Sequence, residues 1–324
     1  MPIWVDDPEF QISNHVHGVA LAEAAAQPEF EDLVEELFAS PVDLHRPLWD
    51  LWLVTGLPDR RVAIVFQLHH AVADGIAAAA IATALLAPPT EPLPAPPPSP
   101  RPSPSTGALL IDNLRWRLAM LVSAVRPVLH PLRTARRAAE FVAQLRALWS
   151  RNRGNVRTSL NQPLGRARRL AVLDVPLATV KAAGHRSATV NDVLLTAIGG
   201  GFRTLLDARN EVLSGPLHAS EGVSLRSADD ASAGNQAGGM LVPLHADVSD
   251  PAERLRRITE DTRALKAERG TPAVVGILDS PWLPGAVTAF FERRLRSQTL
   301  VQTYVANVPG PVGRCTCSER PFAS

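Results

Sequence analysis

The chain has 324 residues, of which 46% are hydrophobic and 20% are charged, so it can bury the core of one large or two ordinary domains. Its formal net charge of +1 provides no global field that would attract nucleic acid. Its cysteines, Cys315 and Cys317, lie together, which excludes a disulfide framework and leaves too few ligands for a zinc site. We find no secretory signal and no apolar run of roughly 18 residues, and we therefore expect a cytoplasmic location.

Hydrophobic periodicity predicts a mixed α/β unit over residues 1–87, which we take as the first domain. The expected strands are residues 15–21, 47–55 and 61–69, and the expected helices are residues 31–39 and 76–86. Turn-forming residues at 56–60 lie between the last two strands, so these strands are expected to pair as a hairpin.

Composition changes abruptly after this unit. Residues 88–108 are rich in Pro, Ser and Ala and predict an extended linker. Residues 109–168 predict a helical connector that contains both leucine and arginine residues. We expect this helix to be broken near Pro127 and Pro131. Such a basic amphipathic stretch can lie on an anionic lipid surface, although packing of its apolar stripe on the protein core is the more common arrangement.

A second α/β unit is predicted over residues 169–311. Its expected strands are residues 170–175, 222–226, 240–244 and 299–308, and its expected helices are residues 191–206 and 250–266. The remaining residues, 312–324, have a different composition and form an atypical tail.

The main candidate for chemistry is the run from His69 through His70, Asp74 and Gly75, at a predicted strand-to-helix junction. His70 continues the even-numbered apolar set of its strand, which predicts that it points into the interior. An imidazole with an ordinary pKa of about 6.5 suits a general base. Asp74 would fix the turn and Gly75 would free the backbone to begin the helix. Alternatively, the histidines serve packing alone and Asp74 is only a helix N-cap.

Other catalytic signatures are absent from the sequence. It has no Gly-x-Ser-x-Gly elbow and no Gly-x-x-x-x-Gly-Lys loop. No cysteine precedes Cys315, which argues against a thiol nucleophile in the core. The run Gly199–Gly201 lacks dinucleotide-binding spacing, and we interpret it as allowing close packing of a helix.

The run 69–75 matches the His-His-x-x-x-Asp-Gly motif of the CoA-dependent acyltransferase superfamily, which includes chloramphenicol acetyltransferase and nonribosomal peptide condensation domains. Further segments resemble one branch, the bacterial wax ester synthase/diacylglycerol acyltransferases. They are Pro47-Leu48-Trp49, Thr189-Val190-Asn191-Asp192-Val193, Val223-Ser224-Leu225-Arg226 with Gly234-Asn235, and Asn307-Val308-Pro309-Gly310-Pro311. Their order and approximate spacing agree with that family over nearly the whole chain.

The resemblance implies an α/β fold of two chloramphenicol-acetyltransferase-like domains with a tunnel between them. Both domains are expected to be incomplete, because family members are longer at both ends. The implied substrates are acyl-CoA and a diacylglycerol or long-chain alcohol. No metal, bound cofactor or nucleic acid is expected. A lipid droplet or the inner face of the membrane is a further expected contact.

The resemblance also implies roles for individual residues. His70 is the general base and Asp74 a structural carboxylate that pairs with an arginine, for which Arg226 is our candidate. The supporting residues are His69, Gly75, Asn191 and Asp192, and the substrate-binding residues are Pro47, Leu48, Trp49 and Asn307. Two alternatives stay open: a condensation-type acyltransferase that uses a carrier protein, and a noncatalytic remnant that binds a lipid surface or a partner.

Overall fold

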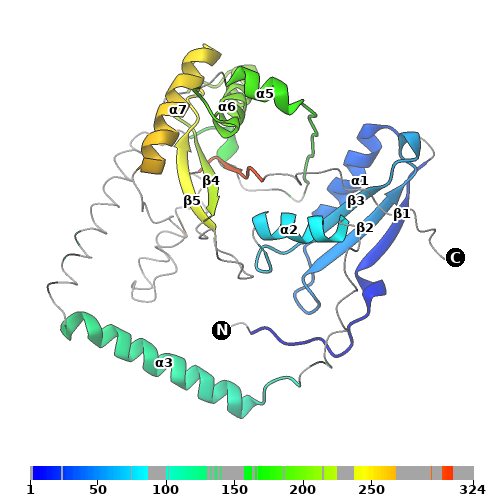
Figure 1. Ribbon diagram of the computed structural model, residues 1–324, viewed down its shortest axis with the longest axis vertical. Coiled ribbons are helices and arrows are strands. Elements are labelled where there is room, and N and C mark those ends of the chain that lie inside the picture. The colour runs from blue at the N-terminus through cyan, green and yellow to red at the C-terminus, as the bar shows by residue number, and fades with distance from the viewer. Residues whose placement is uncertain are drawn as a thin grey trace.

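The computed structural model describes residues 3–22, 25–73, 75–86, 100, 102–129, 132, 136, 139, 157–162, 165, 167–184, 187–213, 215–224, 237–267, 293 and 301–308. These residues form two α/β units, each built on a three-stranded sheet, and one long helix that stands apart from both (Figure 1). The expected mixed α/β class is therefore confirmed. The proposed domain boundaries stay a prediction, and most of the linker and the whole tail lie outside the described residues.

The N-terminal unit contains the predicted strands and helices in the predicted order. Its elements are η1 (Ile12–Asn14), β1 (Val16–Ala20), α1 (Gln27–Ala39), β2 (Trp49–Thr55), η2 (Pro58–Arg60), β3 (Ala63–Leu68) and α2 (Gly75–Leu86). The sheet order is β1-β2-β3, with β1 parallel and β3 antiparallel to β2. The expected hairpin is thus confirmed, and its register pairs Trp49 with Leu68.

Burial differs between the two faces of this sheet. Val54 and Val65 are buried on one face, and Gln67 on that face donates from its side-chain amide to the carbonyl of Ser40 at the end of α1. On the opposite face, Val16 and Ile64 are 37% and 45% exposed. The odd-numbered residues of β3 therefore supply its most buried side chain, whereas the sequence pattern favoured the even-numbered set.

The C-terminal unit packs two long helices on its sheet. Its elements are η3 (Ser159–Asn161), α5 (Leu177–Ala183), α6 (Val190–Ala208), β4 (His218–Ser224), β5 (Ala237–Pro243), α7 (Pro251–Ala267) and β6 (Thr303–Val305). The sheet order is β5-β4-β6, with β5 antiparallel and β6 parallel to β4. The core lies between helices and sheet, and its fully buried members are Leu195, Ala219, Val242, Leu244 and Ile258.

Glycine lets α6 approach the end of β5 closely. A β-carbon on Gly199 would lie 2.3 Å from the carbonyl oxygen of Leu244, and one on Gly200 would lie 2.8 Å from Nη1 of Arg254. At Gly201 no atom would lie within 4 Å. The interpretation of the glycine run as a packing device is therefore confirmed for its first two members and not for the third.

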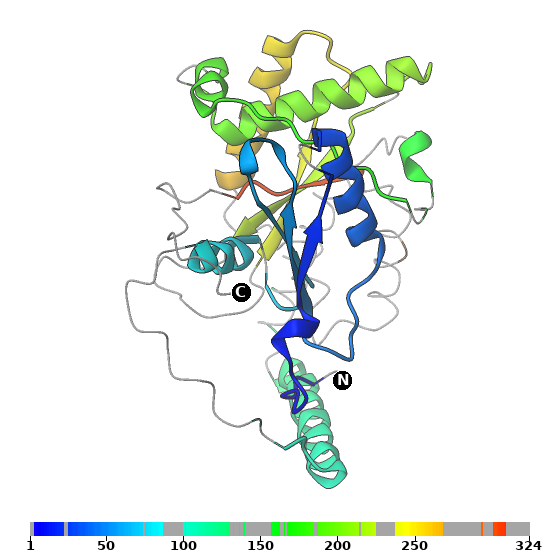
Figure 2. The ribbon, with the colours of Figure 1, turned by 90° about the vertical axis from the view of Figure 1, so that its right-hand side faces the viewer.

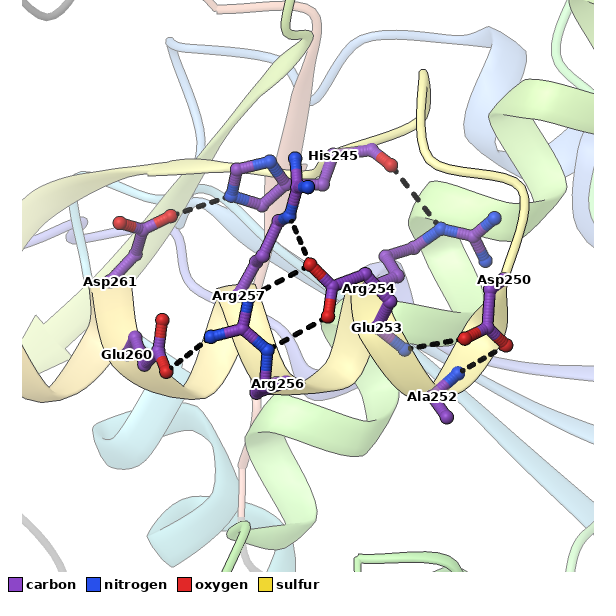
Figure 3. Close-up of polar contacts among 9 residues, drawn as sticks. All are labelled: His245, Asp250, Ala252, Glu253, Arg254, Arg256, Arg257, Glu260 and Asp261. Atoms are coloured by element: carbon purple, nitrogen blue, oxygen red, sulfur yellow. Dashed lines mark hydrogen bonds and ion pairs between the residues drawn. The ribbon is translucent and has the colours of Figure 1, made fainter.

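Helix α7 carries charged side chains along its exposed side (Figure 3). Glu253 accepts hydrogen bonds from Arg256 and Arg257, which lower the pKa of its carboxyl to about 2. Asp250 accepts from the backbone N–H groups of Ala252 and Glu253, and so satisfies two free donors of the helix N-terminus.

One expected strand is wrong, because residues 170–175 belong to no described sheet and Leu173 there is 87% exposed. Helix α3 spans Thr106–Leu129 and so includes Pro127. The break expected near Pro127 and Pro131 stays a prediction, because residues 130–131 lie outside the described residues. No described helix has the length and apolar character needed to cross a membrane.

Candidate functional site

The first two predicted motifs meet at one end of the N-terminal hairpin. The backbone N–H of His69 donates to the carbonyl of Leu48 across 3.0 Å, which joins the Pro-Leu-Trp segment to the histidine turn. That turn is closed by Val72 N–H, which donates to the carbonyl of His69 at 2.9 Å. The Nδ1 atom of His69 also accepts from the N–H of Ala71 at 3.1 Å. The His69 ring is therefore committed to holding the turn that presents His70.

His70 lies in this turn, two residues beyond the end of β3, and it is exposed. The expectation that it points into the interior is wrong, because strand alternation stops at Leu68. Asp74 lies outside the described residues, so its pairing stays a prediction, as does the role of Arg226. Three residues after His70, Ala73 is only 5% exposed, and its burial anchors the end of the turn before α2 begins.

The start of α2 touches the segment that follows β6. A β-carbon on Gly75 would lie 3.2 Å from Cγ2 of Val308, so this glycine allows a contact that a larger residue would crowd. Val308 follows Asn307, which is exposed. Two predicted motifs that are more than 230 positions apart in the sequence thus lie side by side, one from each sheet unit.

Asn191 and Asp192 are placed differently, at the buried N-terminus of α6. Thr189 and Asp192 form a reciprocal capping box, in which the Thr189 N–H donates to Oδ2 of Asp192 at 2.8 Å. The hydroxyl of Thr262 on α7 donates to the other oxygen of Asp192 at 2.8 Å. This carboxylate is 2% exposed and joins two helices, so it is a structural group rather than one that meets a substrate.

No sequence motif marked the polar cluster that lies beside Trp49. The Nδ1 atom of His15 donates to the carbonyl of Trp49 at 2.8 Å, and Nε2 of His17 lies 3.2 Å from Oδ1 of Asp50. The rings of His15 and Trp49 are 4.9 Å apart. These contacts fix the first residues of β2, which carry the Pro-Leu-Trp segment. The alternation of His15 and His17 in an expected strand was the available signal.

The N-terminal unit also has a hollow of about 410 Å³ near Phe30, Leu57 and Arg61. It lies at the Ala63 end of β3, whereas His70 follows the opposite end. The hollow is therefore separate from the histidine turn, and the tunnel between the units stays a prediction. Among the described side chains, no group of three His, Cys, Asp or Glu residues could hold a metal ion.

Comparison with known proteins agrees with this arrangement. The family model described as "Wax ester synthase/diacylglycerol acyltransferase catalytic domain" matches residues 1–194, and that described as "WS/DGAT C-terminal domain" matches residues 233–324. A candidate diacylglycerol O-acyltransferase of Mycobacterium tuberculosis strain H37Rv is 33% identical over 323 residues, which cover 96% of this chain and 68% of that protein. Another, from Mycobacterium bovis, is 31% identical over 319 residues and covers 96% and 67%.

A solved structure supports the fold. The wax ester synthase/diacylglycerol acyltransferase from Marinobacter aquaeolei VT8 superposes with a TM-score of 0.59 at 24% identity, covering 96% of this chain and 65% of that one. The chain thus spans about two thirds of the length of these relatives.

The match to the catalytic-domain model identifies the chain as an acyltransferase, and its two α/β units meet where Gly75 lies against Val308. With both family models matched in order, the chain belongs to the wax ester synthase/diacylglycerol acyltransferase family. The condensation-type alternative is accordingly not favoured.

Proposed function

We propose that the chain transfers a fatty acyl group from acyl-CoA to the hydroxyl of a diacylglycerol or a long-chain alcohol. The observation that carries this proposal is the contact between Gly75 and Val308. It sets the segment after β6 against the helix that begins at the histidine turn, as a site formed by both units requires. The family of the chain supplies the reaction class.

The reaction needs one base and no acyl-enzyme, because a thioester is already activated. The His70 imidazole takes the proton from the acceptor hydroxyl while its oxygen forms a bond to the thioester carbonyl carbon. The tetrahedral intermediate then collapses and its carbon–sulfur bond breaks. The departing CoA thiolate takes up the proton from the imidazolium, which restores the base. A positioned general base contributes about 10²–10⁴-fold in rate, and the alignment of two substrates supplies further acceleration.

The test is the His70→Ala variant, assayed with acyl-CoA and either diacylglycerol or a long-chain alcohol. Turnover should fall by about 10²–10⁴-fold while the melting midpoint is kept, because His70 is exposed. His45→Ala is the matched control, since His45 is an exposed histidine on the loop before β2. Full turnover by His70→Ala would remove the proposed base.

We also propose that α3 docks this protein on an anionic lipid surface. Leu110, Ile111, Leu114, Leu118, Leu121 and Val122 are all exposed. At 3.6 residues per turn they share one face, with Arg115 and Arg117 near its two edges. The helix stands apart from both sheets in Figures 1 and 2. An apolar face with flanking cations is suited to the boundary between headgroups and acyl chains.

Co-sedimentation with vesicles tests this contact. The chain should bind phosphatidylglycerol-containing vesicles more than phosphatidylcholine vesicles, and added salt should weaken the binding. Leu114→Glu should abolish it, whereas Leu44→Glu should not, since Leu44 is 69% exposed but lies in a loop. Equal binding by both variants would exclude α3 as the docking surface.

A further inference from the structure

An extended segment that precedes α5 crosses from the C-terminal unit onto helix α1 of the N-terminal unit (Figure 1). We call residues 167–175 the strap. All of its side chains are exposed, and it pairs with no described strand. The strap therefore buries little apolar surface, so polar contacts must supply much of what holds it in place.

The chain is anchored on the C-terminal unit both before and after the strap. Before it, Leu160 packs against the buried cluster around Leu206, and the backbone N–H of Ser159 donates to the carboxylate of Glu211 at 2.7 Å. After it, α5 contacts α6. The chain thus leaves the C-terminal unit, reaches α1 and returns to the unit it left.

Glu35 on α1 binds the strap with both oxygens of its carboxylate. Oε1 accepts a hydrogen bond from the backbone N–H of Leu170 at 2.7 Å, and Oε2 accepts one from Nη1 of Arg169 at 3.0 Å. The Glu35 side chain is 13% exposed, whereas that of Arg169 is 85% exposed. Because water and salt weaken an exposed ion pair, the bond to Leu170 is the more important of the two. Glu35 therefore holds the main chain of the strap as well as one of its side chains.

The strap gives the two units a second point of contact. The first point is the contact of Gly75 with Val308, which sets the segment after β6 against the start of α2. The strap instead contacts α1, and α1 and α2 lie to either side of the N-terminal strands in Figure 2. Two bodies that meet at one point can rotate about it, and a second, separate point restricts that rotation.

We propose that Glu35 is a positioning residue for acyl transfer, which fixes the strap on α1 and so keeps residues 306–308 of the C-terminal unit against α2. This proposal rests on the proposed function, in which both units contribute to one site. A displacement of about 1 Å in a site that aligns two substrates can lower the rate by about 10²-fold. Loss of the hydrogen bond to Leu170 should therefore reduce turnover, although Glu35 is on α1 and not in the histidine turn.

Hydrogen–deuterium exchange of the full chain tests the contact directly, because the Leu170 N–H is the donor. In Glu35→Ala, exchange of this amide should rise by about tenfold or more, the factor expected when a hydrogen bond to a charged group is lost. Glu35→Gln keeps a side-chain oxygen that can accept the same bond, so it should keep most of the protection. Glu36→Ala is the matched control, since Glu36 is the next residue of α1 and is exposed. Equal exchange of the Leu170 amide in Glu35→Ala and wild type would overturn the proposal.

The second experiment measures kcat and KM in the same variants, with acyl-CoA and either diacylglycerol or a long-chain alcohol. Glu35→Ala should lower kcat by about 10–10²-fold with smaller changes in KM, because alignment is lost rather than binding. Its melting midpoint should stay close to that of wild type, since each unit keeps its own core. Glu35→Gln should recover most of the lost kcat, and Arg169→Ala should lower kcat much less than Glu35→Ala. Wild-type kcat in a Glu35→Ala protein whose Leu170 amide exchanges faster would overturn the positioning role.

Together the two experiments separate this proposal from the proposed function. If wild type shows no acyl transfer while the exchange pattern holds, the proposed function fails and the positioning role fails with it, but the contact between Glu35 and the strap stands. If wild type is active and exchange of the Leu170 amide does not respond to Glu35→Ala, the proposed function stands and the positioning role is refuted.

Discussion

Replacing the glycines of α6 with alanine measures how closely this helix must approach the sheet. Gly199 and Gly201 lie two positions apart in the same helix, and alanine is favoured over glycine in a helix interior by about 1 kcal/mol. That gain is common to both variants. A β-carbon on Gly199 would lie 2.3 Å from the backbone oxygen of Leu244, whereas one on Gly201 meets no atom within 4 Å. The variants therefore differ only in packing.

The cost at Gly199 follows from which atom is crowded. A backbone oxygen cannot rotate away, so the helix must retreat by roughly 1 Å to restore an ordinary contact distance. Overpacking of this kind costs about 1–3 kcal/mol. Gly201→Ala should therefore be up to about 1 kcal/mol more stable than wild type, and Gly199→Ala should lie about 1–3 kcal/mol below Gly201→Ala.

Thermal unfolding of the two variants and wild type provides the measurement. Each kcal/mol should move the midpoint by about 2–4 °C for a unit of this size. The expected order of midpoints is Gly201→Ala, wild type and Gly199→Ala. Equal midpoints for the two alanine variants would show that α6 does not press on the carbonyl of Leu244, and the reasoning would be refuted.

Three further changes test other parts of the fold. Burial lowers the pKa of His218 to about 4, so the free energy of unfolding should fall by about 3 kcal/mol in all as pH drops from 6.5 to 4. In the His218→Gln variant, denaturant titrations should show a smaller fall in the free energy of unfolding over the same pH range. Gly75→Val should lower kcat by crowding Val308, and the double variant Gly75→Val/Val308→Ala should recover part of the lost kcat. A double variant with no recovery of kcat would count against the contact between Gly75 and Val308. Gly56→Ala should cost at least about 1–2 kcal/mol, because Gly56 has φ 87° and its new β-carbon would lie 2.4 Å from the oxygen of Leu21; an unchanged urea midpoint would contradict this.

The elements that the sequence predicts best are those whose burial follows one simple period. Helix α6 and the β2–β3 hairpin were anticipated to within a few residues, since their apolar spacing and turn residues agree. Residues 170–175 have a similar alternation, yet they form no strand because no described strand pairs with them. Hydrophobic periodicity indicates which side chains favour burial, but it does not indicate whether a partner strand is present.

The candidate site was predictable only where motifs marked it. The motifs marked the Pro-Leu-Trp and histidine segments, and the structure brings Leu48 and His69 together. The roles assigned to residues of these segments stay predictions. The orientation of His70 was missed because alternation was extended past the last residue of β3. The sequence also gave no signal that Glu221 on β4 is only 8% exposed, since a single glutamate in a strand is expected to face solvent until its neighbours are known.

The parallel pairing of β6 with β4 has a consequence for synthesis on the ribosome. Ala219 pairs with Thr303, so the closing strand emerges only after more than eighty further residues have been added. Until then β4 has an unpaired edge, which is a site for wrong association. Non-local contacts of this kind also form slowly. Because β6 is synthesised last, the C-terminal unit of the nascent chain should need protection of the β4 edge until β6 pairs with it. The β2–β3 hairpin of the N-terminal unit can form earlier, since both of its strands have already been synthesised.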